Sequence, residues 1–150
     1  METNGDISRM VARVARAHSA VASTLLHVMG LYPGQELLLQ QLWESDHRTQ
    51  ADLTAALGLD ASTVTRTVQC LGRSGLLTRA PSATDRRAVI VSLTPAGHAL
   101  RELIEEYWES LGAAATRDMS PRQRAAALVL LNRIEGNLSR SADQPSTSRT

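Results

Sequence analysis

The sequence predicts a mainly α-helical protein with one small β-hairpin. Apolar residues recur at helical spacing along most of the chain, as at Ile7 and Met10. Two helical segments in the middle of the chain are separated only by the short turn 57–60. Two alternating, β-branched segments follow at 76–80 and 88–93. A helix pair with a tight turn and a following hairpin, or β-wing, is the pattern of a winged helix-turn-helix.

Each predicted helix has a start or stop signal. Thr49 and Asp60 are predicted N-caps, and Gly58 and Gly75 end the helices that these residues begin. Proline in the first helical turn marks the start of later helices. The predicted helices span residues 7–29, 34–44, 50–57, 61–73, 95–117 and 121–138.

The chain is predicted to form one unit built around the winged helix-turn-helix at residues 31–93. Long helices within 7–30 and 94–139 flank this module. Their apolar faces cannot all be buried on so small a module, which predicts that they are dimerisation helices covered by a second copy of the chain. The polar residues 1–6 are expected to be loose, and residues 140–150 are expected to form a disordered tail.

The composition indicates a soluble, cytoplasmic protein. No run of about 18 apolar residues occurs, so no membrane contact is predicted. The single cysteine, Cys70, excludes an internal disulfide and a thiolate zinc site. The net charge is only +1, but residues 50–100 carry five arginines against three aspartates, a balance of +2. The excess positive charge therefore lies in the winged helix-turn-helix.

The predicted helix 61–73 has a polar face opposite its apolar one. Taking 100° per residue, Val64, Val68 and Leu71 lie on one side. The polar residues on and beside the other side are Ser62, Thr63, Thr65, Arg66, Gln69 and Arg73. Arginine recognises guanine or phosphate, glutamine recognises adenine, and hydroxyls contact phosphates or thymine methyls. We therefore predict that this helix binds double-stranded DNA.

The hairpin tip at 81–87 supports the same prediction. It carries Arg86 and Arg87, and an extended arginine fits the negative potential of a narrow minor groove. The carboxylate of Asp85 is predicted to hold the guanidinium of Arg87 in that extended conformation, without contacting DNA itself.

These motifs resemble the MarR family of bacterial winged-helix transcriptional regulators. Thr54 departs from the family, which usually has alanine there. The matching segments are Leu57-Gly58-Leu59, Ser62-Thr63-Val64-Thr65-Arg66, Gly75-Leu76-Leu77, Asp85-Arg86-Arg87 and Leu93-Thr94-Pro95-Ala96-Gly97.

The resemblance implies a homodimer that binds a pseudo-palindromic operator and most often represses transcription. It also implies that a small-molecule effector can bind a cleft between the dimerisation helices and the DNA-binding module, and so lower DNA affinity. Residues that could line such a cleft are Met29, Tyr32, Trp43 and Tyr107. Each of them is favoured as a core or dimer-interface residue over a ligand contact. No cofactor is predicted.

Other functions are weighed against this prediction. A winged helix used for protein contacts would be expected to carry large apolar residues on the outer face of helix 61–73, where this chain has polar ones. A thiol-responsive regulator acting through Cys70 stays an alternative, although no second cysteine could resolve an oxidised thiol. The four histidines lack metal-ligand spacing, and no catalytic motif occurs, so neither a metal site nor an enzyme is predicted.

Overall fold

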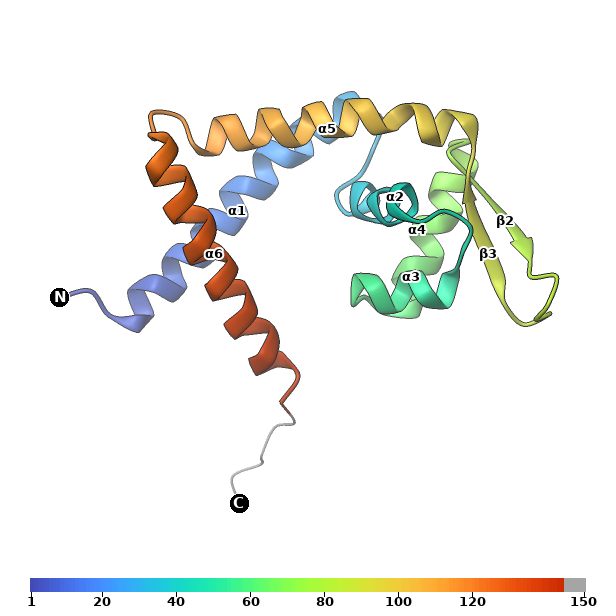
Figure 1. Ribbon diagram of the computed structural model, residues 1–150, viewed down its shortest axis with the longest axis horizontal. Helices are drawn as coiled ribbons and strands as arrows, with labels where there is room; N and C mark the ends of the chain where they lie inside the picture. The colour runs from blue at the N-terminus through green and yellow to red at the C-terminus, as the bar shows by residue number, and fades with distance from the viewer. Residues whose placement is uncertain (145–150) are drawn as a thin grey trace, which may run out of the picture. The chain divides into compact units, whose positions relative to one another are not determined.

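The computed structural model describes residues 1–144 (Figure 1). It divides into two compact units, Met1–Leu111 and a second that begins at Gly112. The first unit contains the winged helix-turn-helix and the second contains the last helix. The elements in chain order are α1 (Asn4–Val28), α2 (Gln35–Glu44), β1 (Arg48–Thr49), α3 (Gln50–Leu57), α4 (Ala61–Arg73), β2 (Leu77–Pro81), β3 (Val89–Leu93), α5 (Pro95–Ala115) and α6 (Pro121–Ala142). The predicted class, mainly α with a small β-wing, is confirmed.

The helix-turn-helix begins and ends at the residues that the sequence predicted. The hydroxyl of Thr49 accepts the backbone N–H of Asp52, and the carboxylate of Asp60 accepts that of Thr63. Gly58 ends α3 with φ 63°, a left-handed conformation that glycine adopts without steric cost. The turn between α3 and α4 is therefore determined by local sequence.

Two predictions about the chain ends are wrong. Residues 1–6 are not all loose, because Thr3 and Asp6 form a capping box that starts α1 at Asn4. The hydroxyl and backbone bonds to Thr3 lower the pKa of the Asp6 carboxyl. At the other end, α6 continues to Ala142, beyond the predicted end at 138. The tail predicted for 140–150 is thus helical at its start, and residues 145–150 lie outside the described part of the chain.

The core of the first unit is built mainly from leucine and valine. Leu38, Leu53, Val64 and Val91 come from four different elements and are at most 1% exposed. Ile104 of α5 is fully buried with them. Because α5 contributes to this core, the long helix is an integral part of the unit that holds the winged helix.

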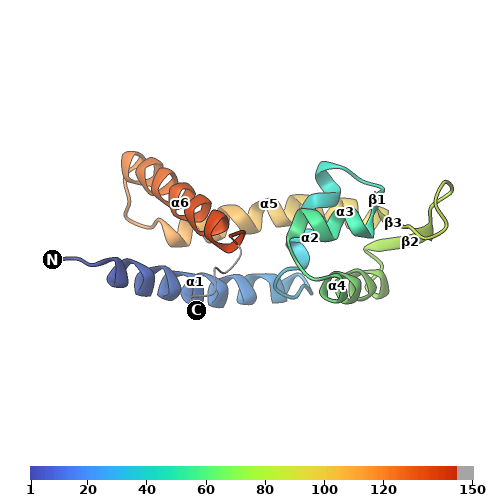
Figure 2. The same ribbon diagram turned by 90° about the horizontal axis from the view of Figure 1, so that it is seen from below.

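The sheet has three strands rather than the predicted two. Its order is β1-β3-β2, and both neighbouring pairs are antiparallel. The first strand is only two residues long, Arg48 opposite Val91 and Thr49 opposite Ile90. So short a segment shows no alternation in the sequence, which is why hydrophobic periodicity did not reveal it. Figure 2 shows the β2–β3 hairpin projecting beyond α3 and α4.

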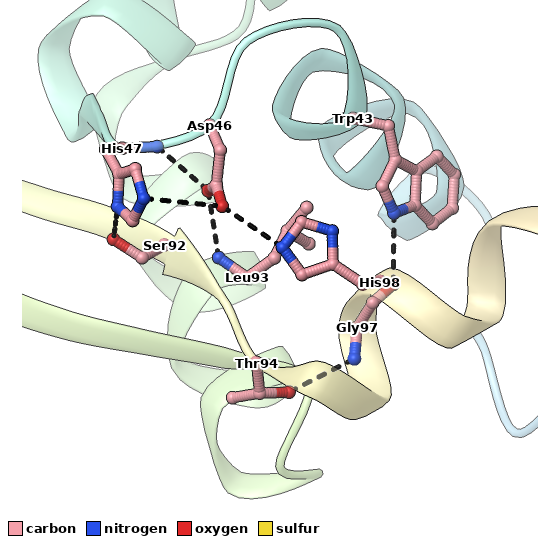
Figure 3. Close-up of polar contacts among 8 residues, drawn as sticks. All are labelled: Trp43, Asp46, His47, Ser92, Leu93, Thr94, Gly97 and His98. Carbon is pink, nitrogen blue, oxygen red and sulfur yellow. Dashed lines mark hydrogen bonds and ion pairs between the residues drawn. The ribbon is translucent and has the colours of Figure 1, made fainter.

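The start of α5 packs closely against α2 and against the turn between α4 and β2. The backbone carbonyl of Gly97 accepts a hydrogen bond from Nε1 of the buried Trp43 at 3.0 Å (Figure 3). A Cβ atom at position 97 would overlap the carbonyl oxygen of Leu76. That same carbonyl accepts the backbone N–H of Thr94 at 3.0 Å. Only glycine therefore fits at position 97.

Candidate nucleic-acid interface

Helix α4 buries one face and presents the other to solvent. Val64, Val68 and Leu71 are at most 1% exposed. On the opposite face, Ser62, Arg66 and Arg73 are exposed, whereas Thr63, Thr65 and Gln69 are half-buried. The polar stripe therefore lies outside the core.

Hydrogen bonds within the protein occupy the hydroxyl protons of this stripe. Ser62 and Thr63 both donate to the carboxylate of Asp60. These bonds, with the one from Ser62 the strongest, lower the pKa of Asp60, so its carboxylate stays charged at neutral pH.

The hydroxyl group of Thr65 is also engaged in hydrogen bonds within the protein. Its hydroxyl donates to the carbonyl of Ala61 at 2.8 Å and accepts a hydrogen bond from the Gln50 side chain at 2.6 Å. The side chains of the stripe whose donors are not engaged by protein acceptors in the described structure are Arg66, Gln69 and Arg73. They are the donors available to base edges and phosphates.

An open groove of about 490 Å³ lies between α4 and the hairpin. Arg73 of α4 and Arg79 of β2 both line it, so the groove carries two basic residues. Arg79 is absent from the residues that the sequence predicted as contacts, because its place beside α4 follows from strand packing that no local motif encodes. The lining residues are Gln69, Gly72, Arg73, Leu77, Arg79, Ala80, Pro81 and Val89.

The hairpin tip is closed by its own hydrogen bonds. The backbone N–H of Ser82 donates to the carbonyl of Ala88 at 2.9 Å, and that of Ala88 donates to the carbonyl of Asp85 at 3.0 Å. The hydroxyl of Ser82 also accepts the backbone N–H groups of Thr84 and Asp85, each at 3.3 Å. These bonds define the tip that carries the two arginines.

Asp85 contacts Arg87 differently from the prediction. Its Oδ1 accepts the backbone N–H of Arg87 at 3.0 Å, whereas the predicted contact was with the guanidinium. The two residues are only two positions apart in a tight turn, which favours such an Asx-type bond to the backbone. Both Arg86 and Arg87 are exposed. The carboxylate therefore shapes the turn and leaves the exposed side chain of Arg87 outside this bond.

Comparison with known proteins identifies the family. Residues 31–89, which cover the helix-turn-helix and most of the hairpin, match the sequence profile of the MarR family. This segment is a MarR-family domain. An organic hydroperoxide resistance transcriptional regulator of Bacillus subtilis is 39% identical over 71 residues, which are 47% of this chain and 48% of that protein. An uncharacterised HTH-type transcriptional regulator of Staphylococcus aureus is 25% identical over 131 residues, 86% of this chain and 90% of the relative.

A solved structure supports the same fold. Bordetella bronchiseptica BpsR, whose DNA binding is regulated by 6-hydroxynicotinic acid, is 26% identical. The alignment covers 86% of this chain and 98% of BpsR, with a TM-score of 0.76. This MarR-family chain is thus a transcriptional regulator with a DNA-binding winged-helix fold, and its relatives are regulators rather than enzymes.

The four residues predicted to line an effector cleft differ in their exposure to solvent in this MarR-family chain. Trp43 and Tyr107 are 8% and 4% exposed and belong to the core. Burial, followed by the nearby charge of Glu36, raises the pKa of Tyr107. Met29 packs against that core from its edge, whereas Tyr32 is exposed. Of the four, only Met29 and Tyr32 are accessible to a ligand without opening the core.

Cys70 lies half-buried on α4, and its sulfur accepts a hydrogen bond from the Gln35 side chain at 3.2 Å. Residues 1–144 contain no cluster of three or more His, Cys, Asp or Glu side chains suited to a metal ion. Within the same residues, every helix is too short or too polar to cross a membrane.

Proposed function

We propose that this MarR-family regulator acts as a homodimeric repressor of the genes beside its operator. In this proposal α4 enters the major groove of each half-site and Arg87 enters the adjacent minor groove. The supporting observation is that the polar stripe of α4 and the arginine-tipped hairpin belong to one unit. The groove between them holds Arg73 and Arg79, which suit the phosphates between the two DNA grooves.

The three available donor side chains of α4 are proposed to have different roles in DNA binding. Arg66 is proposed to bind guanine through O6 and N7, and Gln69 to bind adenine through N6 and N7. Arg73, at the end of α4 and in the groove, is proposed to bind a phosphate. The hydroxyl oxygens of Ser62 and Thr63 can then only accept hydrogen bonds from base amino groups, while Thr65 presents its methyl group.

Substitutions on α4 test this division. The probe is a duplex that the wild-type protein selects from a randomised pool, compared with a scrambled duplex of equal length by fluorescence anisotropy. Arg66→Ala and Gln69→Ala are each expected to cost about 1–3 kcal/mol per half-site on the selected duplex and to reduce the preference over the scrambled one. Arg73→Ala is expected to weaken both duplexes equally. Equal weakening of both duplexes by Arg66→Ala and Gln69→Ala would contradict the assignment of base readout.

Dimerisation is proposed from the apolar faces that each unit leaves exposed. On α1 of the first unit, Ile7, Met10 and Val14 are about half exposed. On α6 of the second unit, the run of apolar residues is exposed in the same way: Leu128, Val129, Leu130 and Leu131. Exposed apolar surface on two long helices is typical of a protein–protein interface.

We expect the wild-type protein to sediment as a dimer at micromolar concentration. Met10→Asp and Leu131→Asp should each raise the dimer dissociation constant by roughly a hundredfold or more, because they place an unpaired carboxylate in an apolar interface. Val89→Asp, at an exposed apolar position of the hairpin, is the matched control and should leave the dimer intact. A wild-type monomer at micromolar concentration would contradict the proposal.

Effector control is part of the same proposal. The similarity to BpsR supports a small molecule as the signal that lowers DNA affinity, through contacts that differ between the bound and released states. Met29 and Tyr32 are the proposed first contacts for such a molecule, since they are the accessible members of the predicted cleft.

A further inference from the structure

One carboxylate lies where the hairpin strand β3 joins helix α5. Asp46, in the turn between α2 and β1, uses Oδ1 to accept the backbone N–H of Leu93 at 2.9 Å (Figure 3). The same oxygen accepts the backbone N–H of His47 at 2.8 Å. The Asp46 side chain is only 18% exposed, so this contact is largely shielded from water. It connects residues 47 positions apart in the sequence.

The carboxylate continues the β1–β3 ladder where the backbone of β1 cannot. The paired residues are Arg48 with Val91 and Thr49 with Ile90, so the next positions would be His47 with Ser92 and Asp46 with Leu93. His47 has φ 56°, a left-handed conformation in which a strand cannot continue. The side chain of Asp46 supplies the acceptor that the missing strand residue would have offered to Leu93.

Two imidazoles surround the other oxygen of Asp46. Nε2 of His98, in the first turn of α5, is 3.4 Å from Oδ2, and Nε2 of His47 is 3.8 Å from it. Nδ1 of His47 is 2.7 Å from the hydroxyl of Ser92. Both histidines are more than half exposed, so water screens their attraction to the carboxylate. The shielded bond to Leu93 is therefore the stronger link.

The other end of β3 leads to the wing tip. From Leu93 to Val89 the strand spans roughly 13 Å at about 3.3 Å per residue, and the tip with Arg87 follows directly. The two-residue β1 is the only neighbour of β3 on that side of the sheet within the described structure. Without the Asp46 bond, this end of β3 loses its connection to the turn between α2 and β1, while the tip keeps its own hydrogen bonds.

We infer that Asp46 is a positioning residue for DNA binding: by accepting the N–H of Leu93 it sets the direction in which the hairpin presents Arg87 to the minor groove. This inference rests on the proposed role of Arg87. If Asp46 acts by positioning Arg87, the effect of an Asp46 substitution on DNA affinity should depend on the presence of the Arg87 side chain. A purely structural role of Asp46 would not show this dependence.

A double-mutant cycle tests this dependence on the selected duplex. Asp46→Ala is expected to weaken binding about five- to tenfold, which corresponds to one hydrogen bond at the lower end of the ordinary range in each half of a dimer. In an Arg87→Ala background, the same substitution should change affinity by less than about twofold, whereas in an Arg66→Ala background it should keep its full effect. Asp46→Asn retains a side-chain carbonyl that can accept from Leu93 and should bind within about twofold of wild type.

Amide exchange measured by NMR provides the readout on the protein itself. The Leu93 N–H should exchange faster in Asp46→Ala than in Asp46→Asn, while amides of α4 are unchanged. An unchanged effect of Asp46→Ala without Arg87, or an Asp46→Asn variant as weak as Asp46→Ala, would overturn the inference. If Arg87→Ala alone leaves the affinity unchanged, the proposed contact of Arg87 with DNA is wrong. The single substitution shows this independently of the result for Asp46.

Discussion

Arg87→Ala is expected to lower the affinity for the selected operator by roughly a hundredfold or more. A hydrogen bond to a charged group contributes about 1.5–3 kcal/mol, and a dimer would lose one such contact at each wing. The loss should be similar on A·T-rich and mixed flanking sequences at high salt, and larger on A·T-rich ones at low salt, where a narrow minor groove has a stronger negative potential. Anisotropy titrations between about 50 and 200 mM salt measure this effect.

The salt dependence identifies the origin of the loss. Removing one phosphate-region charge from each wing should reduce the slope of log affinity against log salt by about 1 per arginine. Arg101→Ala, an exposed arginine on α5 outside the proposed interface, is the control and should change neither affinity nor slope. The thermal unfolding of Arg87→Ala should match wild type because the side chain is open to solvent. A variant that unfolds early would show that Arg87 is structural.

Gly97→Ala is expected to destabilise the protein more than any surface substitution. The added methyl group would overlap the backbone carbonyl of Leu76 and press on the Leu93 side chain, 3.1 Å away. A backbone atom cannot move aside as a flexible side chain can, so the first turn of α5 must shift and the Trp43 bond to Gly97 must weaken. Overpacking of this kind costs about 1–3 kcal/mol or more.

Thermal unfolding followed by circular dichroism measures the Gly97 effect, with Tm expected to fall by about 5–10 °C. Gly112→Ala is the matched control in the same helix, because a Cβ there meets nothing within 4 Å in the described structure. That variant should be as stable as wild type or more so, by up to about 1 kcal/mol, since alanine favours helix more than glycine does. If both alanines behaved alike, the close approach at Leu76 would not be a real constraint.

The sequence predicted the elements whose signals are local. The bounds of α3 and α4 were predicted correctly because caps and left-handed glycines lie next to the residues they organise. The start of α1 was missed although Thr3 and Asp6 form a capping box, since the polar composition of the first residues suggested disorder. The two-residue β1 was missed because it owes its strand conformation to pairing with a distant β3.

The same distinction applies to the candidate interface. The outward face of α4 follows from helical periodicity within one segment, and Arg86 and Arg87 lie in a hairpin tip that the turn residues predicted. The role of Asp46 depends on a bond to Leu93, 47 positions away, and that of Arg79 on how β2 packs beside α4. Such contacts leave no spacing pattern in a single sequence. The Asp85 bond was assigned to the wrong atoms of Arg87, because spacing alone does not distinguish backbone from side chain.

The hydrogen bonds of the hairpin tip lie within the tip itself, so this segment could be replaced by another loop. Hydrogen bonds among Ser82, Asp85 and Ala88 close residues 82–88. The segment joins the rest of the hairpin at Pro81 and Val89, which are paired with each other. A loop of the same length from a relative could therefore be transplanted here, carrying a different minor-groove preference on an unchanged scaffold. If Arg87 reads the minor groove as proposed, this part of operator choice can change independently of α4, so that regulators with the same recognition helix can diverge in the genes they control.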